Sequence, residues 1–94
     1  MDNTLNVNYT DLQLRTLVEE YIMQQETILS LKGACDYVLY WAIEDGRSVN
    51  ADLFDGIALQ SNDQKRVKCI LENIVKDGRI APSSIEGIYE RVKN

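Results

Sequence analysis

The sequence contains no histidine, and its 94 residues include only two cysteines and one proline. Without histidine, the chain lacks the usual base of a nucleophilic triad and the commonest metal ligand. Cys35 and Cys69 stand far apart and form no C-x-x-C pair, so they predict neither a zinc site nor a redox motif. The sequence also has no glycine-rich phosphate-binding motif. We therefore expect no catalytic residue, no metal and no cofactor, and a protein that is not an enzyme.

Long hydrophobic runs are absent as well. No stretch of about 18 apolar residues occurs, so the sequence predicts no transmembrane helix. The segment Met1–Asn6 is polar and has no basic region followed by an apolar core, which argues against a secretory signal. Two isolated cysteines are typical of reduced thiols, and we expect Cys35 on an apolar helix face and Cys69 on a polar one. Together these features predict a cytoplasmic protein.

Positive charge is scarce in most of the chain, whose formal net charge is −5. Residues 1–60 carry ten acidic and three basic residues, a balance of −7, whereas residues 61–94 carry five acidic and seven basic residues, a balance of +2. Because binding to nucleic acid depends on neutralising phosphates, an acidic chain is not expected to bind it, nor an anionic membrane. Lys65, Arg66 and Lys68 fall in the first turns of an expected helix, where the helix dipole disfavours cations. We interpret these three residues as a contact for an acidic partner.

What the sequence does contain is a dense apolar and aromatic stretch at residues 31–45. Its apolar residues recur at the i, i+3, i+4, i+7 spacing of a helix that is buried over more than half of its circumference. We expect this helix to be the central element of the core. The residues on its apolar face are Leu31, Ala34, Cys35, Val38, Leu39, Trp41 and Ala42.

An earlier helix is expected from residue 11, because Thr10 and Gln13 have the spacing of a capping box and an apolar face follows. Before residue 45, only Gly33 interrupts the helical pattern, and a mid-helix glycine costs only about 1 kcal/mol relative to alanine. We therefore predict one long helix over residues 11–45, bent near Gly33; two helices joined at residues 30–33 are the open alternative. An apolar or small residue at every seventh position suits a supercoiled helix. The residues of this repeat are Leu14, Tyr21, Ile28, Cys35 and Ala42.

The long helix would span roughly 50 Å at a rise of about 1.5 Å per residue. A chain of 94 residues is too small to cover such a rod alone, so a homodimer follows from this helix. We expect Leu14, Tyr21 and Ile28 to form the dimer seam.

Three shorter helices are expected in the rest of the chain, over residues 51–59, 61–77 and 83–92. Ser61 with Gln64 and Ser83 with Glu86 have capping-box spacing at the start of the last two. Two glycines, Gly46 and Gly78, follow expected helix ends, each within an Asp-Gly-Arg sequence whose significance stays open. No strand-like alternation is long enough to predict a sheet. The expected fold is an all-α helical bundle that forms a single domain over residues 1–94, with residues 1–8 disordered.

Gly33, Tyr37, Tyr40 and Glu44 form a stripe at i, i+4, i+7 and i+11 on the other side of the central helix. Tyrosine is favoured at interfaces because it combines a large contact area with a polar tip. The glycine would allow another backbone to approach closely. We interpret these four residues as the contact for another protein, against the alternative that the chain's own last helix covers them.

The function predicted from these features is a non-enzymatic protein–protein interaction module: a homodimeric regulator, an inhibitor or immunity-type protein, or an adaptor. The alternative is a small helix-turn-helix-like DNA-binding transcriptional regulator. Its reading helix would be residues 50–55, which carry two aspartates and no base, or residues 83–92, which follow a more basic segment.

Overall fold

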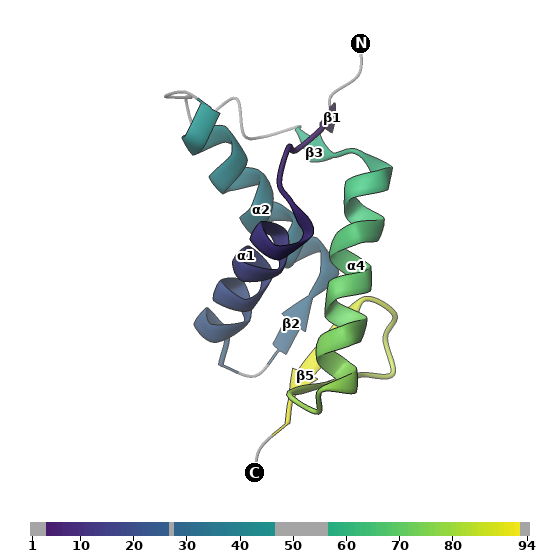
Figure 1. Cartoon of the computed structure of the whole chain (residues 1–94). Coiled ribbons are helices and arrows are strands. Elements are labelled where there is room, and N and C mark those ends of the chain that lie inside the picture. Colours follow the sequence, from purple (N-terminus) through teal and green to yellow (C-terminus); the bar gives the residue numbers. More distant parts are fainter. Residues whose placement is uncertain (1–3, 27, 47–56, 93–94) are drawn as a thin grey trace.

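The structure, a computed structural model, describes residues 4–26, 28–46 and 57–92. The described residues form three helices that are combined with short strands (Figure 1). In chain order, the elements are β1 (Thr4–Leu5), α1 (Asp11–Gln24), β2 (Ile28–Ser30), α2 (Leu31–Gly46), β3 (Ala58–Leu59), α4 (Ser61–Lys76), β4 (Ile80–Pro82) and β5 (Ile88–Arg91).

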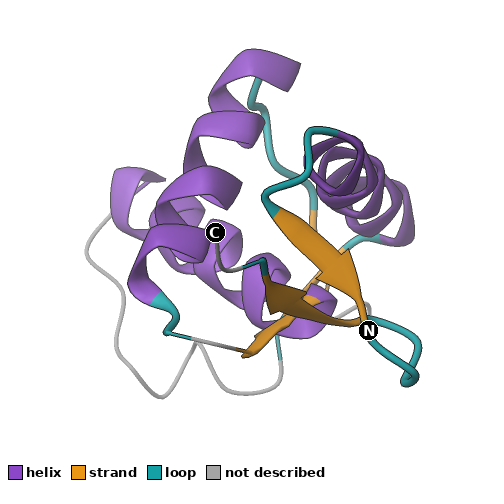
Figure 2. Cartoon of the chain, turned by 90° about the horizontal axis from the view of Figure 1, so that it is seen from below, coloured by secondary structure: helices purple, strands orange, loops and turns teal. Residues whose placement is uncertain are grey.

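The strands form two small sheets near opposite ends of α4 (Figure 1). At one end, β1 pairs in parallel with β3. At the other end, β2, β5 and β4 form an antiparallel sheet in that order. Leu29 lies opposite Tyr89 in this sheet, and both side chains are buried. The view from below shows the helices packed beside the strands (Figure 2).

The prediction of an all-α helical bundle is therefore wrong. The strands that overturn it are two to four residues long, which is too short for the alternation that identifies a strand in a sequence. Strands β1 and β2 form because they pair with strands that are distant in the chain: the register joins Thr4 to Ala58 and Ile28 to Glu90. Such pairing leaves no local signal.

The single helix over residues 11–45 is also wrong: two helices are observed, and the break between them lies at residues 25–30 rather than at 30–33. Helix α1 ends at Gln24, Gln25 is extended with φ −95° and ψ 136°, and α2 begins at Leu31. Two residues of the expected dimer seam, Leu14 and Tyr21, are buried within the chain, and Ile28 lies on strand β2 with 61% of its surface exposed. The expected seam depended on one long helix and loses that support, and the homodimer stays a prediction.

The expected helix over residues 83–92 is a β-hairpin instead, because β4 and β5 are joined there by a tight turn. In this turn Gly87 has a φ of +82°, which favours glycine, and the Ser83 hydroxyl accepts a hydrogen bond from the Ile85 amide at 3.1 Å. The serine of the expected capping box therefore stabilises a turn. Of the expected helix over 51–59, residues 51–56 lie outside the described residues, and Ala58–Leu59 are extended.

The expected capping box at the start of α4 does not form either. Gln60 takes the N-cap position without a side-chain hydrogen bond. The side-chain amide of Gln64 donates instead to the Leu59 carbonyl oxygen at 2.8 Å. In contrast, the capping box at the start of α1 is confirmed, with reciprocal Thr10–Gln13 hydrogen bonds of 2.9 and 3.1 Å. The helix end at Gly78 is also confirmed, since Gly78 follows α4 with a φ of +84°, whereas Gly46 is the last residue of α2 and not the residue after it.

The core lies between α1, α2 and α4 and is closed by the buried faces of the strands. The apolar face predicted for the central helix supplies Ala34, Cys35, Val38 and Leu39 to this core. Residues 4–8 are not disordered, since Thr4–Leu5 form β1 and the Val7 side chain is buried; residues 1–3 lie outside the described residues.

Candidate functional site

An aromatic cluster on α2 remains partly on the surface after folding. Tyr40 is 48% exposed and Trp41 is 37% exposed, and their rings meet edge to face with centroids 6.0 Å apart. Tyr37 lies one helical turn before Trp41, with a centroid distance of 6.4 Å, and its ring also neighbours Tyr21 of α1 at 6.2 Å. The four rings form a continuous row from the buried side of α1 to the surface of α2.

Within this row, Tyr37 is hydrogen-bonded to two residues of α1. Its hydroxyl donates to the Glu20 carboxylate at 3.0 Å and accepts from the Gln24 side-chain amide at 3.2 Å. Both interactions use the Tyr37 hydroxyl, which we expected from the sequence to contact a partner protein. The outward-facing part of the cluster is therefore Tyr40 with Trp41, which we call the aromatic surface.

Gly33 permits a close approach, but by a side chain of the same chain. The Tyr21 hydroxyl sits where a methyl group on Gly33 would be, and the Ser30 hydroxyl oxygen is only 2.8 Å from that position. The same Tyr21 oxygen accepts a hydrogen bond from the Ser30 amide at 3.1 Å, and the Ser30 oxygen accepts one from the Gly33 amide at 2.8 Å. The structure thus gives Gly33 a role inside the fold, at the junction of β2 and α2.

The exposure of the other stripe residues, and of Trp41 beside them, agrees only in part with the prediction. Tyr40 is exposed as expected, and the side chain of Glu44 lies outside the described part of the chain. Trp41 was assigned to the buried face and was missed as a surface residue. A signal for it exists in the sequence, because the amphipathic indole is adjacent to Tyr40 and one turn after Tyr37.

The three basic residues expected to meet an acidic partner have three different surroundings. Arg66 is engaged within the fold: its guanidinium donates to Asp63 at 3.1 Å, to Asp11 at 2.9 Å and to the Tyr9 carbonyl oxygen at 2.7 Å. These bonds, led by the one to Asp11, raise the pKa of Arg66, which stays charged. Lys68 lies 3.9 Å from Glu86. Lys65 is exposed and lines a surface groove of about 650 Å³ between α1 and α4.

Asp63 was not singled out in the sequence, although it is the only buried charged residue among those described. Its side chain is 1% exposed, accepts a hydrogen bond from the Val7 amide at 3.0 Å and pairs with Arg66. The position at the third residue of α4 also suits a carboxylate, because the helix dipole is positive there. This carboxylate therefore holds the N-terminal segment on α4.

A second charge network joins α1 to the turn after α4. Glu19 accepts from Arg79 at 2.7 Å and from Arg15 at 3.1 Å, and Arg15 also donates to Asp77 at 2.9 Å. The hydrogen bond from Arg79, followed by the one from Arg15, lowers the pKa of the Glu19 carboxyl. Asp77 and Arg79 belong to the second Asp-Gly-Arg sequence, which thus has a structural use here.

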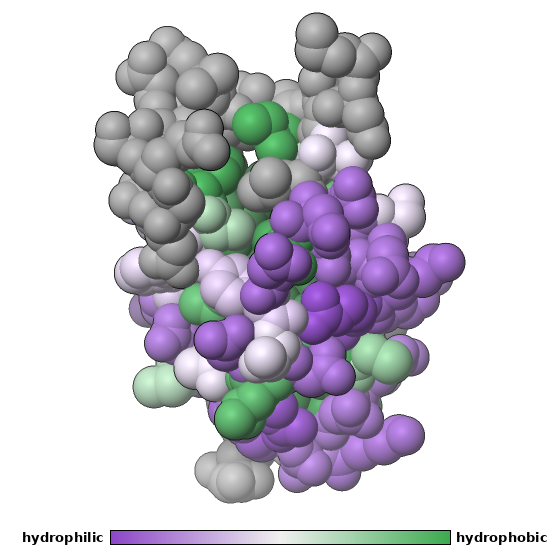
Figure 3. Space-filling model, turned by 45° about the horizontal axis from the view of Figure 1, so that its top comes forward, coloured by the Kyte–Doolittle hydropathy of each residue, from purple (hydrophilic) through white to green (hydrophobic). Residues whose placement is uncertain are grey.

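Hydropathy is unevenly distributed over the face of the molecule shown in Figure 3. Hydrophilic residues dominate the side of the molecule that carries α4, and hydrophobic residues occupy separate spots (Figure 3). Within the described ranges, no three His, Cys, Asp or Glu residues are grouped to hold a metal ion. Across the same ranges, no helix is both long and apolar enough to cross a bilayer.

Comparison with known proteins gives no relative: no family model, no curated protein and no solved structure matches the chain. The aromatic surface and its surroundings are therefore the basis for inferring a function.

Proposed function

We propose that the chain is a non-enzymatic protein-binding module whose contact is the aromatic surface, Tyr40 with Trp41. The observation that carries the proposal is the exposure of these two large rings, 48% and 37%, side by side on one helix. Aromatic residues of this kind dominate the free energy of binding at protein interfaces, because they bury a large area at a small cost in side-chain entropy.

The surroundings favour a partner surface that is apolar and carries basic groups. Glu20 lies beside the ring row through its bond to Tyr37, and the chain as a whole carries a net charge of −5. A guanidinium or ammonium group can stack on the face of a tryptophan or tyrosine ring while it approaches a nearby carboxylate. An acidic regulator, inhibitor or adaptor in a reducing, cytoplasmic compartment remains the class of protein that we propose.

The test compares capture of partner proteins from a lysate of the native host by the intact chain and by a Tyr40→Ala, Trp41→Ala variant. We expect the partner that the intact chain captures specifically to bind the variant at least about tenfold more weakly, since truncating interface aromatics costs at least about 1 kcal/mol each. Circular dichroism should show that the variant keeps its helices.

The matched control is Leu12→Ala, which removes an apolar side chain that is 75% exposed on α1, away from the aromatic surface. Binding should survive this change. If both variants retain the partner as well as the intact chain does, the aromatic surface is not the contact. Self-association of the chain at tens of micromolar that is lost in the aromatic variant would identify a second copy as the partner.

DNA binding is a second candidate, and one observation favours it. A strand between α1 and α2, followed by a later helix that leads directly into a β-hairpin, with the sheet order β2–β5–β4, is the order of elements in winged helix-turn-helix domains. In that layout α4 would be the reading helix, and residues 83–92, proposed earlier for this role, are the hairpin. This is an analogy of fold, and it does not by itself indicate function.

Charge weighs against this second candidate. Five of the eight described lysines and arginines already form ion pairs with described carboxylates; these are Arg15, Lys32, Arg66, Lys68 and Arg79. A DNA-binding α4 would show binding to a duplex that falls steeply with salt and is lost in a Lys65→Gln, Lys68→Gln, Lys76→Gln variant. Lys32→Gln, on α2, is the control. We expect no salt-dependent retardation of the duplex by the intact chain.

A further inference from the structure

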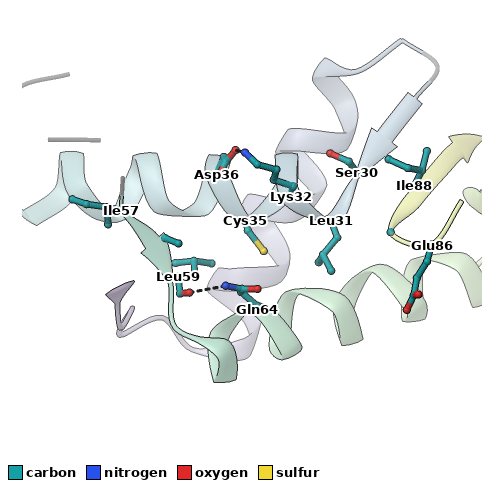
Figure 4. A pocket seen from close by; sticks show the side chains of 12 residues that line it. Ser30, Leu31, Lys32, Cys35, Asp36, Ile57, Leu59, Gln64, Glu86 and Ile88 are labelled. Atoms are coloured by element: carbon teal, nitrogen blue, oxygen red, sulfur yellow. Dashed lines mark hydrogen bonds and ion pairs between the residues drawn. The ribbon is translucent and has the colours of Figure 1, made fainter. Parts of the chain in front are cut away.

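A cavity of about 590 Å³ opens between α2 and α4, on a different part of the molecule from the aromatic surface. Figure 4 shows its walls: Leu31 and Cys35 project into it from α2, and Gln64 faces them from α4. Ile57 and Leu59 close one end, next to β3, and Glu86 and Ile88 of the hairpin border the other. Residues from β2, α2, β3, α4 and the hairpin therefore line one space.

The floor of the cavity is formed by buried apolar side chains. Leu59 is 1% exposed and Cys35 is 8% exposed, although both face the space. Burial raises the pKa of the Cys35 thiol to about 11, so the group is neutral at physiological pH and behaves as a small apolar surface. A ligand with an apolar body would therefore gain free energy by displacing water from this floor.

The side-chain amide of Gln64 faces the cavity and has an oxygen that can accept a further hydrogen bond. The Gln64 amide nitrogen donates to the Leu59 carbonyl oxygen at 2.8 Å, which fixes the amide and leaves its oxygen as an acceptor. No residue in the described part of the chain donates to that oxygen. A buried or half-buried ligand that offers an N–H or O–H group would satisfy it.

The charged residues at the rim compensate one another. Lys32 and Asp36 form an ion pair at 3.0 Å, and Glu86 lies 3.9 Å from Lys68. No cation or anion in the described lining is left to select a charged ligand. The volume also falls in the range of about 300–1,000 Å³ that is typical of small-molecule sites.

We propose that the cavity between α2 and α4 binds a neutral, mainly apolar small molecule that donates one hydrogen bond to the Gln64 side-chain oxygen. This site is independent of the proposed protein contact, since neither Tyr40 nor Trp41 lines it.

The first experiment uses N-phenyl-1-naphthylamine, a neutral aromatic amine with one N–H donor, whose fluorescence rises in apolar surroundings. The intact chain should show a saturable rise with a stoichiometry of one. Ala58→Phe, which places a ring at the exposed mouth of the cavity, should weaken binding at least tenfold. Ser84→Phe adds the same ring at an exposed position that does not line the cavity, and it should leave binding unchanged.

The second experiment measures the accessibility of the Cys35 thiol at the floor of the cavity. In a Cys69→Ser background, saturating probe should slow the reaction of Cys35 with methyl methanethiosulfonate at least fivefold. In a Cys35→Ser background, the reaction of the exposed Cys69 should be unaffected. The proposal is overturned if the probe leaves the Cys35 rate unchanged, or if a folded Ala58→Phe variant binds the probe as the intact chain does. Should Ala58→Phe fail to fold, the protection of Cys35 alone decides.

Discussion

The Tyr21 hydroxyl of α1 lies directly against the Cα of Gly33 in α2, in the place that any side chain at position 33 would occupy. The same hydroxyl accepts a hydrogen bond from the Ser30 amide, which points away from β5. One tyrosine thus covers part of the outer edge of β2 and sets the distance between the two helices. The contact therefore lies beside the break between α1 and α2.

Gly33→Ala should therefore destabilise the fold. The added methyl group would overlap the Tyr21 hydroxyl and lie 2.8 Å from the Ser30 oxygen, so the buried Tyr21 ring or the helix must shift. We expect a loss of about 1–3 kcal/mol in the free energy of unfolding, as for other overpacked cores. Chemical denaturation measures it. Without this contact, alanine would instead stabilise the helix by about 1 kcal/mol.

A double-mutant cycle gives the control for that prediction. Tyr21→Phe removes the hydroxyl that overlaps the new methyl group, so Gly33→Ala should cost less in the Tyr21→Phe background than in the intact chain. Equal costs in the two backgrounds would show that the tyrosine does not impose the glycine.

Asp63→Ala should loosen the N-terminal segment. The change removes the acceptor of the buried Val7 amide and one partner of Arg66. An unsatisfied buried amide costs about 1–3 kcal/mol, so we expect a loss of at least that order in the free energy of unfolding. Hydrogen exchange at the Val7 amide should accelerate more than exchange in the middle of α4. Asp36→Ala, which breaks the exposed pair with Lys32, should cost no more than about 0.5 kcal/mol.

The helices of this fold were predictable from the sequence because their signals are local. The Thr10–Gln13 capping box, the Asp-Gly that ends α4 and the apolar spacing of α2 act within a few residues of one another. The strands were not predictable, since β2 is three residues long and is defined by its pairing with β5, about 60 residues later in the chain. The heptad spacing through Leu14, Tyr21 and Ile28 is a coincidence of the kind that such short patterns allow.

The site was predictable only in part, for a similar reason. Tyr40 is exposed as its helical position indicates, but the surroundings of Gly33 and Tyr37 depend on α1, which folds back only because β2 intervenes. Arg66 was assigned to a partner because its bonds to Asp11 and to the Tyr9 carbonyl oxygen bring together residues far apart in the sequence. Long-range contacts of this kind decide whether a charged or aromatic residue is available.

The Glu19 network predicts a specific dependence on acid. Its hydrogen bonds from Arg79 and Arg15 hold the pKa of Glu19 below its ordinary value of 4.5. Because the folded pKa lies below the unfolded one, this contribution to stability is complete above about pH 4.5 and is lost as the pH falls through the folded pKa. Arg79→Gln removes the largest cause of the shift, so the variant should lose less stability than the intact chain between about pH 5 and pH 3.

Thermal unfolding across that range measures the effect, and Lys76→Gln is the control. Lys76 is exposed, lies in the same basic segment (residues 61–94) as Arg79, and forms no ion pair with a described residue. Its variant should follow the pH curve of the intact chain. Parallel curves for the intact chain and Arg79→Gln would show that Glu19 draws no stability from Arg79.

The two cysteines should differ sharply in reactivity. Cys69 is exposed on α4, whereas Cys35 is buried and its pKa is raised to about 11, chiefly by burial and further by Asp36. Since the thiolate is the reacting species, only about one Cys35 thiol in a thousand is ionised at pH 8. A dithiobis(nitrobenzoate) assay at that pH should therefore release one equivalent quickly and the second at least about a hundredfold more slowly. Cys69→Ser should abolish the fast phase and Cys35→Ser the slow one. Two fast equivalents in the intact chain would mean that burial does not suppress the ionisation of the Cys35 thiol.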